Sequence, residues 1–131
     1  MALAPDQVWR RWCELWNQGD LDAAVAETIH PGVEWIPISV EGTHFHGHEG
    51  VRQWAEQHFR FWETFELHID EPVPAGPDRL LVLGYWVARG RGSGLGFERQ
   101  RCAWLLEFRD GTIVRLETFT DRDTGREAAG L

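Results

Sequence analysis

Apolar residues recur at helical spacing along the first part of the chain. Between about residues 5 and 17, Trp9, Trp12 and Trp16 follow an i, i+3, i+7 pattern, so their side chains share one helix face. The segment opens on a proline and an aspartate, which are favoured in the first helical turn, and Gly19 suits the left-handed residue that follows a helix. The pattern predicts a first helix with a stripe of tryptophans.

Two further helices are predicted before the middle of the chain. A short one covers about residues 21–28, and a longer one covers about residues 49–62. On the longer helix, Trp54, His58 and Trp62 stand at i, i+4 and i+8 and therefore share its apolar stripe.

The rest of the chain is rich in β-branched and aromatic residues and in turn signals. It predicts strands over residues 33–38, 65–70, 80–89, 97–108 and 112–120, a glycine-rich turn over 90–96 and a polar tail. Asp110 and Gly111 form one of the strongest hairpin signals. Helices early and an antiparallel meander late predict an α+β fold with the helices on one face of the sheet.

The long strand over 97–108 is apolar on both of its faces. Cys102 and Trp104 alternate with Ala103 and Leu105, whereas a strand with one wet face alternates apolar and polar residues. If the helices cover only one face, a second subunit is the expected cover for the other. The pattern predicts a homodimer through the outer sheet face.

Composition narrows the class of protein. The 131 residues are 43% apolar and 26% charged, with a net charge of −8, which is globular usage and fits a single domain over residues 1–131. The negative charge argues against nucleic acid and anionic membrane surfaces as partners. The sequence shows neither a signal peptide nor an apolar run long enough to span a bilayer, so a cytoplasmic protein is expected.

The two cysteines, Cys13 and Cys102, lie in apolar stretches. They could form a disulfide, but two buried free thiols in a reducing compartment are the favoured interpretation.

Tryptophan is heavily over-represented, with eight in 131 residues. Indole rings carry large apolar area and an N–H group that needs a partner. We interpret the excess as the wall of an apolar pocket containing a few polar groups. The alternative is a solid core that happens to be rich in tryptophan.

Several motifs together resemble those of SnoaL-like proteins in the nuclear transport factor 2-like (ketosteroid isomerase-like) superfamily. They are Trp16-Asn17-Gln18-Gly19-Asp20, His30 to Trp35, Phe45 to Val51, the turn at 90–94, Phe108 to Arg115 with Phe119 and Asp121, and the ending Glu127 to Leu131. The resemblance implies a cone: a curved antiparallel sheet wrapped around three helices of the N-terminal half, as in cystatin-like α+β barrels. It also implies a cavity for small hydrophobic molecules. The superfamily includes ketosteroid isomerases, polyketide cyclases, limonene epoxide hydrolases, scytalone dehydratases and non-catalytic members, so fold does not decide chemistry.

Two catalytic sets that the resemblance suggests are incomplete. In ketosteroid isomerases a carboxylate base would stand at Trp35 or Ile36, and two hydrogen-bond donors near Trp12 and Trp104, where this chain has indole or alkyl side chains. The epoxide hydrolase set needs two carboxylates around an arginine, but Thr118 stands in the last-strand carboxylate position, and Arg99 to Arg101 offers no aspartate.

His58 is the best catalytic candidate, because a neutral imidazole in an apolar cleft can act as a general base. Its alternative role is a core histidine that donates to a carbonyl. Glu117 and Arg101 could complete a polar floor, or could form an exposed cross-strand ion pair, which we favour. Asp121 could be an acid catalyst, but a helix cap or salt-bridge role is favoured.

Metal and cofactor sites are not expected. His44, His46 and His48 would share one face of a straight strand, as zinc requires, but Gly42 and Gly47 break the strand. The glycine-rich stretch over 90–96 lacks the spacing and the following helix of a dinucleotide site.

Three hypotheses remain open. The chain is a cofactor-independent isomerase, cyclase or dehydratase acting on a hydrophobic ring compound, a non-catalytic binding module, or a dimeric scaffold. The predicted catalytic residues are His58, Glu117 and Asp121, and the predicted ligand-binding residues are Trp12, Trp16, Trp35, Trp54, Trp62, Trp86, Arg101 and Trp104.

Overall fold

The computed structural model describes residues 3–38, 44–92 and 97–131. In chain order the elements are α1 (Pro5–Asn17), α2 (Leu21–Thr28), β1 (Ile29–Ile38), β2 (Phe45–His46), α3 (Gly47–Phe61), β3 (Trp62–Pro74), β4 (Arg79–Gly90), β5 (Phe97–Arg109), β6 (Thr112–Phe119) and α4 (Arg122–Ala128). Of the expected turn glycines, Gly42, Gly94 and Gly96 lie outside the described residues. No helix in the described ranges is long and apolar enough to cross a membrane.

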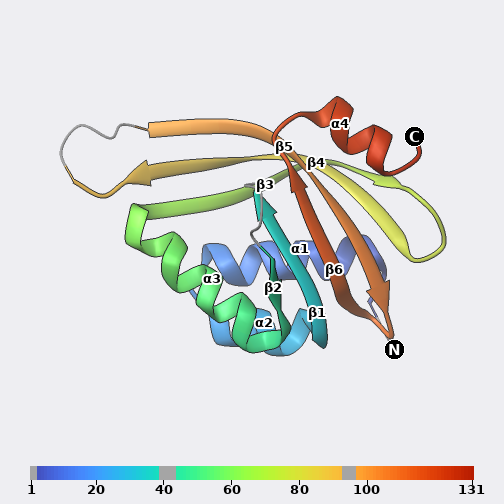
Figure 1. Ribbon diagram of the computed structural model, residues 1–131, viewed down its shortest axis with the longest axis horizontal. Coiled ribbons are helices and arrows are strands. Elements are labelled where there is room, and N and C mark those ends of the chain that lie inside the picture. The colour runs from blue at the N-terminus through green and yellow to red at the C-terminus, as the bar shows by residue number, and fades with distance from the viewer. Residues whose placement is uncertain (1–2, 39–43, 93–96) are drawn as a thin grey trace.

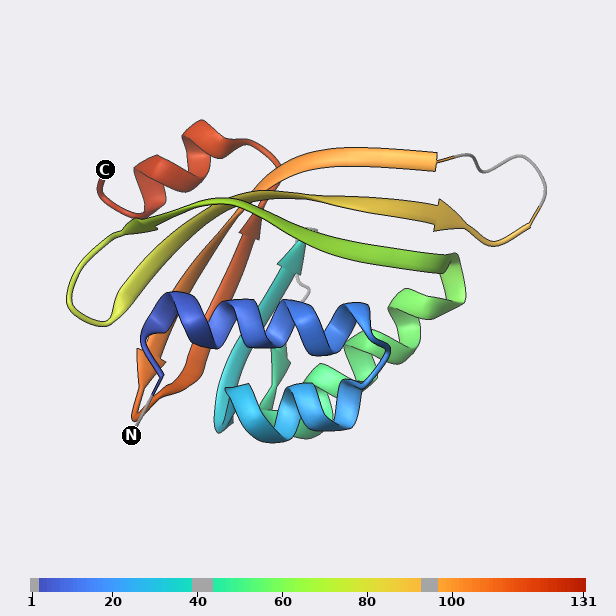
Figure 2. The same cartoon turned by 180° about the vertical axis from the view of Figure 1, so that it is seen from behind.

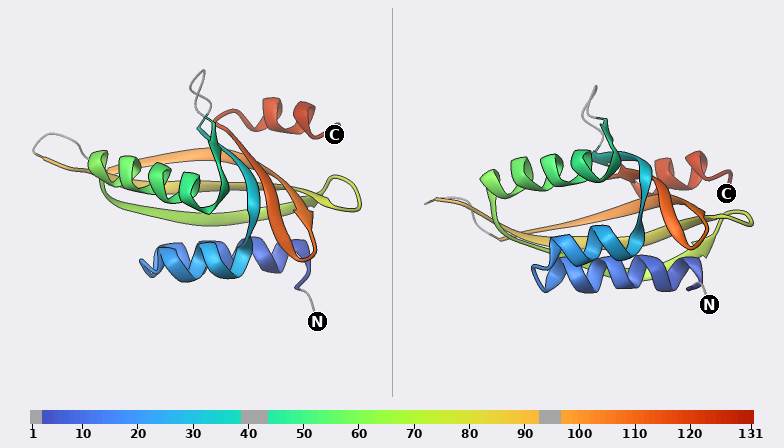
Figure 3. Two further views of the ribbon diagram at one scale, coloured as in Figure 1. Left: turned by 60° about the horizontal axis from the view of Figure 1, so that its bottom comes forward. Right: turned by 90° about the horizontal axis from the view of Figure 1, so that it is seen from below.

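The six strands form one bent sheet in the order β2-β1-β6-β5-β4-β3. Neighbours are antiparallel except β1 and β6, which run parallel. In Figure 1 the arms of β3, β4 and β5 run across the view, while the arrows of β1 and β6 point upward. Figures 2 and 3 show α1 and α2 on one side of this sheet and α4 on the other. The α+β fold with a curved sheet is therefore confirmed, and the sheet is open rather than closed.

The strands β1 and β3 are longer than the sequence predicts. β1 begins at Ile29, four residues before the predicted start, and runs through Pro31. Its register with β6 shifts between Ile29 and Glu34, and a bulge of this kind accommodates a proline that cannot donate a ladder hydrogen bond. β3 is an end strand of the described sheet and continues to Pro74, which an edge position tolerates.

The predicted polar tail is instead the helix α4, and this changes the account of the outer sheet face. Asp121 caps the helix by accepting from the Asp123 N–H at 3.1 Å. Gly125 lies so close to Ala103 that a Cβ at this glycine would come within 2.8 Å of the Ala103 Cβ. Ala103 and Leu105 are buried in one chain, so the premise that helices cover only one face is wrong.

The main core lies between α1, α2, α3 and the inner face of the sheet, and it contains most of the tryptophans. Cys13 and Cys102 are both buried free thiols, as predicted. Burial raises the pKa of Cys102 to about 12, so this thiol stays protonated and unreactive at neutral pH.

Candidate functional site

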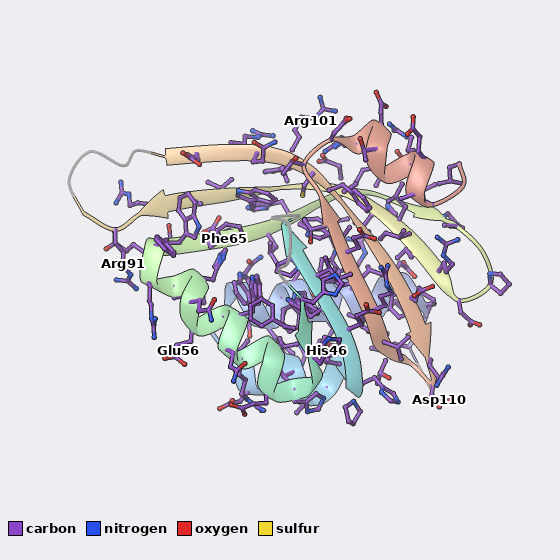
Figure 4. The ribbon with its side chains drawn as sticks, in the orientation of Figure 1. His46, Glu56, Phe65, Arg91, Arg101 and Asp110 are labelled. Carbon is purple, nitrogen blue, oxygen red and sulfur yellow. The ribbon has the colours of Figure 1, made fainter. Side chains whose placement is uncertain are left out.

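A cavity of about 210 Å³ lies between α1, α3 and the inner face of the sheet. Six of the eight tryptophans line it: Trp9, Trp12, Trp35, Trp54, Trp86 and Trp104. They come from α1, β1, α3, β4 and β5, so the wall joins segments that are far apart in the sequence. Figure 4 shows Phe65, another lining residue, in the space between β3 and α3.

The indole rings contact one another around the cavity without filling it. The ring centroids of Trp12 and Trp35 are 5.1 Å apart, and those of Trp9 and Trp104 are 5.2 Å apart. An engineered cavity of about 150 Å³ is enough to bind benzene, whereas drug-sized pockets begin near about 300 Å³. This cavity therefore suits a compact guest of one or two rings.

A glycine makes room for one of these rings. Gly84 on β4 stands beside the Trp104 ring, and a Cβ at this position would come within 2.5 Å of a ring carbon. Because the glycine has no side chain, the Trp104 ring lies across β4 and reaches the cavity.

The exposed residues of the described lining lie near the C-terminal end of α3. Phe61 and Gln57 line it from the last two turns of this helix, and Phe61 is 71% exposed. At the other extreme, the Trp12 side chain is 0% exposed and Trp35 is 1% exposed. A guest would therefore enter past α3 and meet the tryptophans of α1 and β1 last.

Three of the lining indoles have unused donors. The Nε1 atoms of Trp9, Trp12 and Trp35 are buried without a hydrogen-bond partner among the described residues. A buried donor without a partner costs about 1–3 kcal/mol. Such groups call for an explanation, and a ligand acceptor within the cavity is one.

His58 carries the fourth unused polar atom, Nε2. Its ring lies 4.1 Å from the Phe65 ring and 5.1 Å from the Trp54 ring. Burial lowers the pKa of His58 from 6.5 to about 4, so the imidazole is neutral at neutral pH. The described lining contains no Asp, Glu, Arg or Lys, and its other polar side chains are Gln57 and Thr118.

Two predicted ligand-binding tryptophans lie outside the lining. Trp16 packs behind the wall, and its indole N–H donates to the Phe65 carbonyl at 2.8 Å. Trp62 begins β3, and its ring lies 5.9 Å from the Phe65 ring. Arg101 is exposed on the other side of the sheet, as Figure 4 shows. The predicted residues Trp12, Trp35, Trp54, Trp86 and Trp104 do line the cavity.

The two predicted carboxylates also lie away from the cavity. Glu117 pairs with Arg115 at 3.3 Å, and Arg115 pairs with Glu34 at 3.3 Å. Strand alternation explains this, because Leu116 and Thr118 line the cavity and Glu117 between them faces outward. Asp121 caps α4, and hydrogen bonds from the Thr124 hydroxyl and the Asp123 N–H lower its pKa.

Sequence reasoning missed some lining residues. Trp9 stands three residues before Trp12 on the same helix stripe, and that spacing was sufficient to include it among the binding residues. Thr118 is two residues after Leu116 on β6, so strand alternation could have placed both inward. No sequence pattern marks Gln57 as a lining residue, because its place at the edge of the cavity depends on how α3 packs against the sheet.

The histidines of the β1–α3 region make local contacts. His48 Nε2 lies 2.7 Å from the Ile29 carbonyl oxygen, and His44 Nδ1 lies 3.9 Å from a Glu34 carboxylate oxygen. Gly47, with φ +71°, turns the chain between β2 and α3. Within the described residues, no three His, Cys, Asp or Glu side chains are grouped as a metal would require.

Comparison with known proteins identifies the family to which the sequence is similar. The SnoaL-like domain family matches residues 9–116. Among curated proteins, none matches this sequence.

Solved structures share the fold at low sequence identity. An NTF2-like protein of unknown function from Burkholderia pseudomallei is 20% identical, with a TM-score of 0.77 over 96% of this chain and 97% of its own. TerC, co-crystallised with polyporic acid, is 18% identical, with a TM-score of 0.77 over 96% of this chain and 98% of its own. A protein named as a polyketide cyclase from Sinorhizobium meliloti is 22% identical, with a TM-score of 0.67 over 88% of this chain and 94% of its own. At these identities the likeness concerns the fold.

Proposed function

This chain belongs to the SnoaL-like family, and we propose that it binds a small, uncharged ring compound in the tryptophan-lined cavity. The observation that carries the proposal is a cavity of about 210 Å³ walled by six indoles, with no charged side chain in its described lining. An uncharged wall penalises an ionised ligand, because such a ligand would lose its hydration without gaining a counter-charge.

The unused donors narrow the ligand further. Trp9, Trp12 and Trp35 offer N–H groups, and an oxygen acceptor on the ring would pair with one or more of them. A bicyclic ketone such as 1-tetralone combines the expected size with one carbonyl acceptor. TerC, of the same fold, was co-crystallised with polyporic acid, which supports small-molecule binding in this architecture.

Intrinsic tryptophan fluorescence tests the proposal. Titration with 1-tetralone should quench or shift the emission of the wild type. Trp54→Phe, inside the lining, should lose part of this response, and Trp62→Phe, outside it, should respond like the wild type. An unchanged spectrum with 1-tetralone and with larger ring ketones would count against ligand binding.

An acid–base enzyme is the second candidate, and His58 is the observation that favours it. Its Nε2 is buried without a partner, and His58 lines the apolar cavity as a neutral imidazole. A base of low pKa can remove a proton next to a carbonyl when N–H donors stabilise the enolate oxygen, and ketosteroid isomerase works with a base of pKa about 4.6. The proton would pass from the α-carbon to His58, while the indole N–H groups would hold the enolate. Glu117 and Asp121 face elsewhere, so this proposal rests on His58 alone.

Deuterium exchange separates the enzyme from the binding module. The wild type in D₂O should accelerate exchange of the α-protons of 1-tetralone, as measured by NMR. His58→Gln should abolish that acceleration and leave affinity within about threefold, since glutamine cannot take up the proton. Equal exchange rates with and without the wild type would leave the binding module as the function.

The predicted homodimer is a separate proposal. Because α4 covers Ala103 and Leu105, the surface left for a partner is the outer face of the arms, around Tyr85 and Val87. Light scattering tests it, since a mass of twice 15.1 kDa would support a dimer and a mass of 15.1 kDa would exclude a stable one.

A further inference from the structure

The motif Trp16-Asn17-Gln18-Gly19-Asp20 joins α1 to α2 and binds β3. The Trp16 indole N–H donates to the Phe65 carbonyl at 2.8 Å. The Asn17 side chain donates from Nδ2 to the Leu67 carbonyl at 2.9 Å, and its Oδ1 accepts from the Leu67 N–H at 2.9 Å. Two consecutive side chains therefore satisfy three backbone groups of β3.

These contacts meet β3 on an edge that lacks a strand partner. β3 stands at one end of the described sheet, so its backbone groups opposite β4 need partners from elsewhere. A carboxamide carries the same donor and acceptor as a peptide group. Asn17 thus serves at Leu67 as one residue of an additional strand would.

The same stretch of β3 forms part of the cavity wall. The Phe65 and Leu67 side chains both line the cavity. The Phe65 ring lies 4.1 Å from the His58 ring and 5.5 Å from the Trp86 ring. Fixing the backbone of a strand fixes the direction of its side chains, so the distance between α1 and β3 sets the width of the cavity here.

The rest of the motif turns the chain and begins α2. Gly19 adopts φ +78°, a left-handed conformation that turns the chain directly after α1. Asp20 then caps α2 by accepting from the Ala23 N–H at 3.2 Å. Asn17 is the last residue of α1, so its contacts with β3 come from the helix, whereas Asp20 acts on α2.

We propose that Asn17 is a positioning residue of the cavity, which holds β3 so that Phe65 and Leu67 keep their places beside His58. Its link to ligand binding rests on the function proposed above. Asn17 itself is outside the lining, so its effect on a ligand acts through β3.

Hydrogen exchange tests, without any ligand, whether the Asn17 side chain holds the Leu67 backbone of β3. Asn17→Ala should speed exchange of the Leu67 amide at least about tenfold, because this edge amide loses its acceptor. Asp20→Ala is the matched control, since it removes one side-chain hydrogen bond from the same motif and should leave the Leu67 amide unchanged. An unchanged exchange rate of the Leu67 amide in Asn17→Ala would show that Asn17 does not hold β3. If Asn17→Ala does not fold, Asn17→Asp keeps the acceptor and removes the donor, and the cavity readouts below then apply to it.

Two readouts test the positioning of the cavity wall. The His58 ring protons should carry a ring-current shift from Phe65 at neutral pH, and Asn17→Ala should move these resonances while Asp20→Ala should not. Affinity for 1-tetralone should fall about fivefold or more in Asn17→Ala and stay within about twofold in Asp20→Ala. Equal effects of both variants would show a general loss of stability and overturn the positioning role. If the wild type does not bind 1-tetralone, the proposed function loses its support, and the His58 resonances still decide the role of Asn17.

Discussion

Single polar atoms decide what the cavity can hold. The indole N–H groups of Trp9, Trp12 and Trp35 and the Nε2 of His58 are the buried atoms without partners along the described wall. They stand among apolar rings, where an unmade hydrogen bond is most costly. A ligand that places an oxygen acceptor beside the indole N–H groups gains more binding free energy than one that places a carbon atom there.

Replacing Trp35 by phenylalanine should separate hydrogen bonding from packing. The variant keeps an aromatic ring and loses one N–H, so affinity for 1-tetralone should fall by about 3–10-fold, the worth of one net hydrogen bond. Affinity for tetralin, the matching hydrocarbon without the carbonyl, should change less. Calorimetry with both compounds checks this, and an equal loss for the two would assign the role of Trp35 to packing.

His58 should make stability depend on pH. Its pKa is about 4 in the folded chain against an ordinary 6.5, so the unfolded chain binds more protons between these values. The free energy of unfolding should therefore fall as pH drops from about 6.5 to about 4, by roughly 2 kcal/mol once partial exposure is allowed for.

Denaturant unfolding at several pH values measures this slope. His58→Gln does not titrate, and its slope in the same pH window should be smaller than that of the wild type by the His58 contribution. Identical slopes in the two proteins would mean that His58 keeps its ordinary pKa.

At the scale of elements, the amphipathic helices were the easiest to predict. The boundaries of α1 and α2 match the prediction. Pro5 marks the start of α1, Gly19 follows its end, and Asp20 caps α2, so these signals agree with the apolar stripe. The helix α4 was missed because its seven residues include Gly125 and carry no apolar stripe. Its support is tertiary, from the close approach of Gly125 to Ala103, and such a contact leaves no local pattern in the sequence.

Gly125→Val should weaken the packing of α4 on the outer sheet face. The new side chain would meet Ala103, so the free energy of unfolding should fall by about 2–3 kcal/mol. Ala128→Val, at an exposed position of the same helix, is the control and should change it by less than about 1 kcal/mol. Thermal unfolding of both variants checks the difference, and equal stability would contradict this packing.

At the scale of the whole molecule, the sequence predicted an apolar cavity, but it identified only some of the residues that line it. Composition and helical spacing predicted the tryptophan wall, but inward and outward strand positions depend on register and bulges. In the structure Glu117 and Arg101 face outward, and Thr118 lines the cavity. Trp16, predicted to bind the ligand, lies outside the cavity lining, and its indole N–H donates to the Phe65 carbonyl of β3.

A crystal structure with 6-bromo-1-tetralone tests the central claim most directly, because bromine can be located by its anomalous signal. Our account predicts a bromine peak within the cavity, near Trp35 and Trp86, with the ketone oxygen within hydrogen-bond distance of an indole Nε1. A cavity without density at a ligand concentration that saturates the fluorescence change, or a peak elsewhere on the surface, would contradict it.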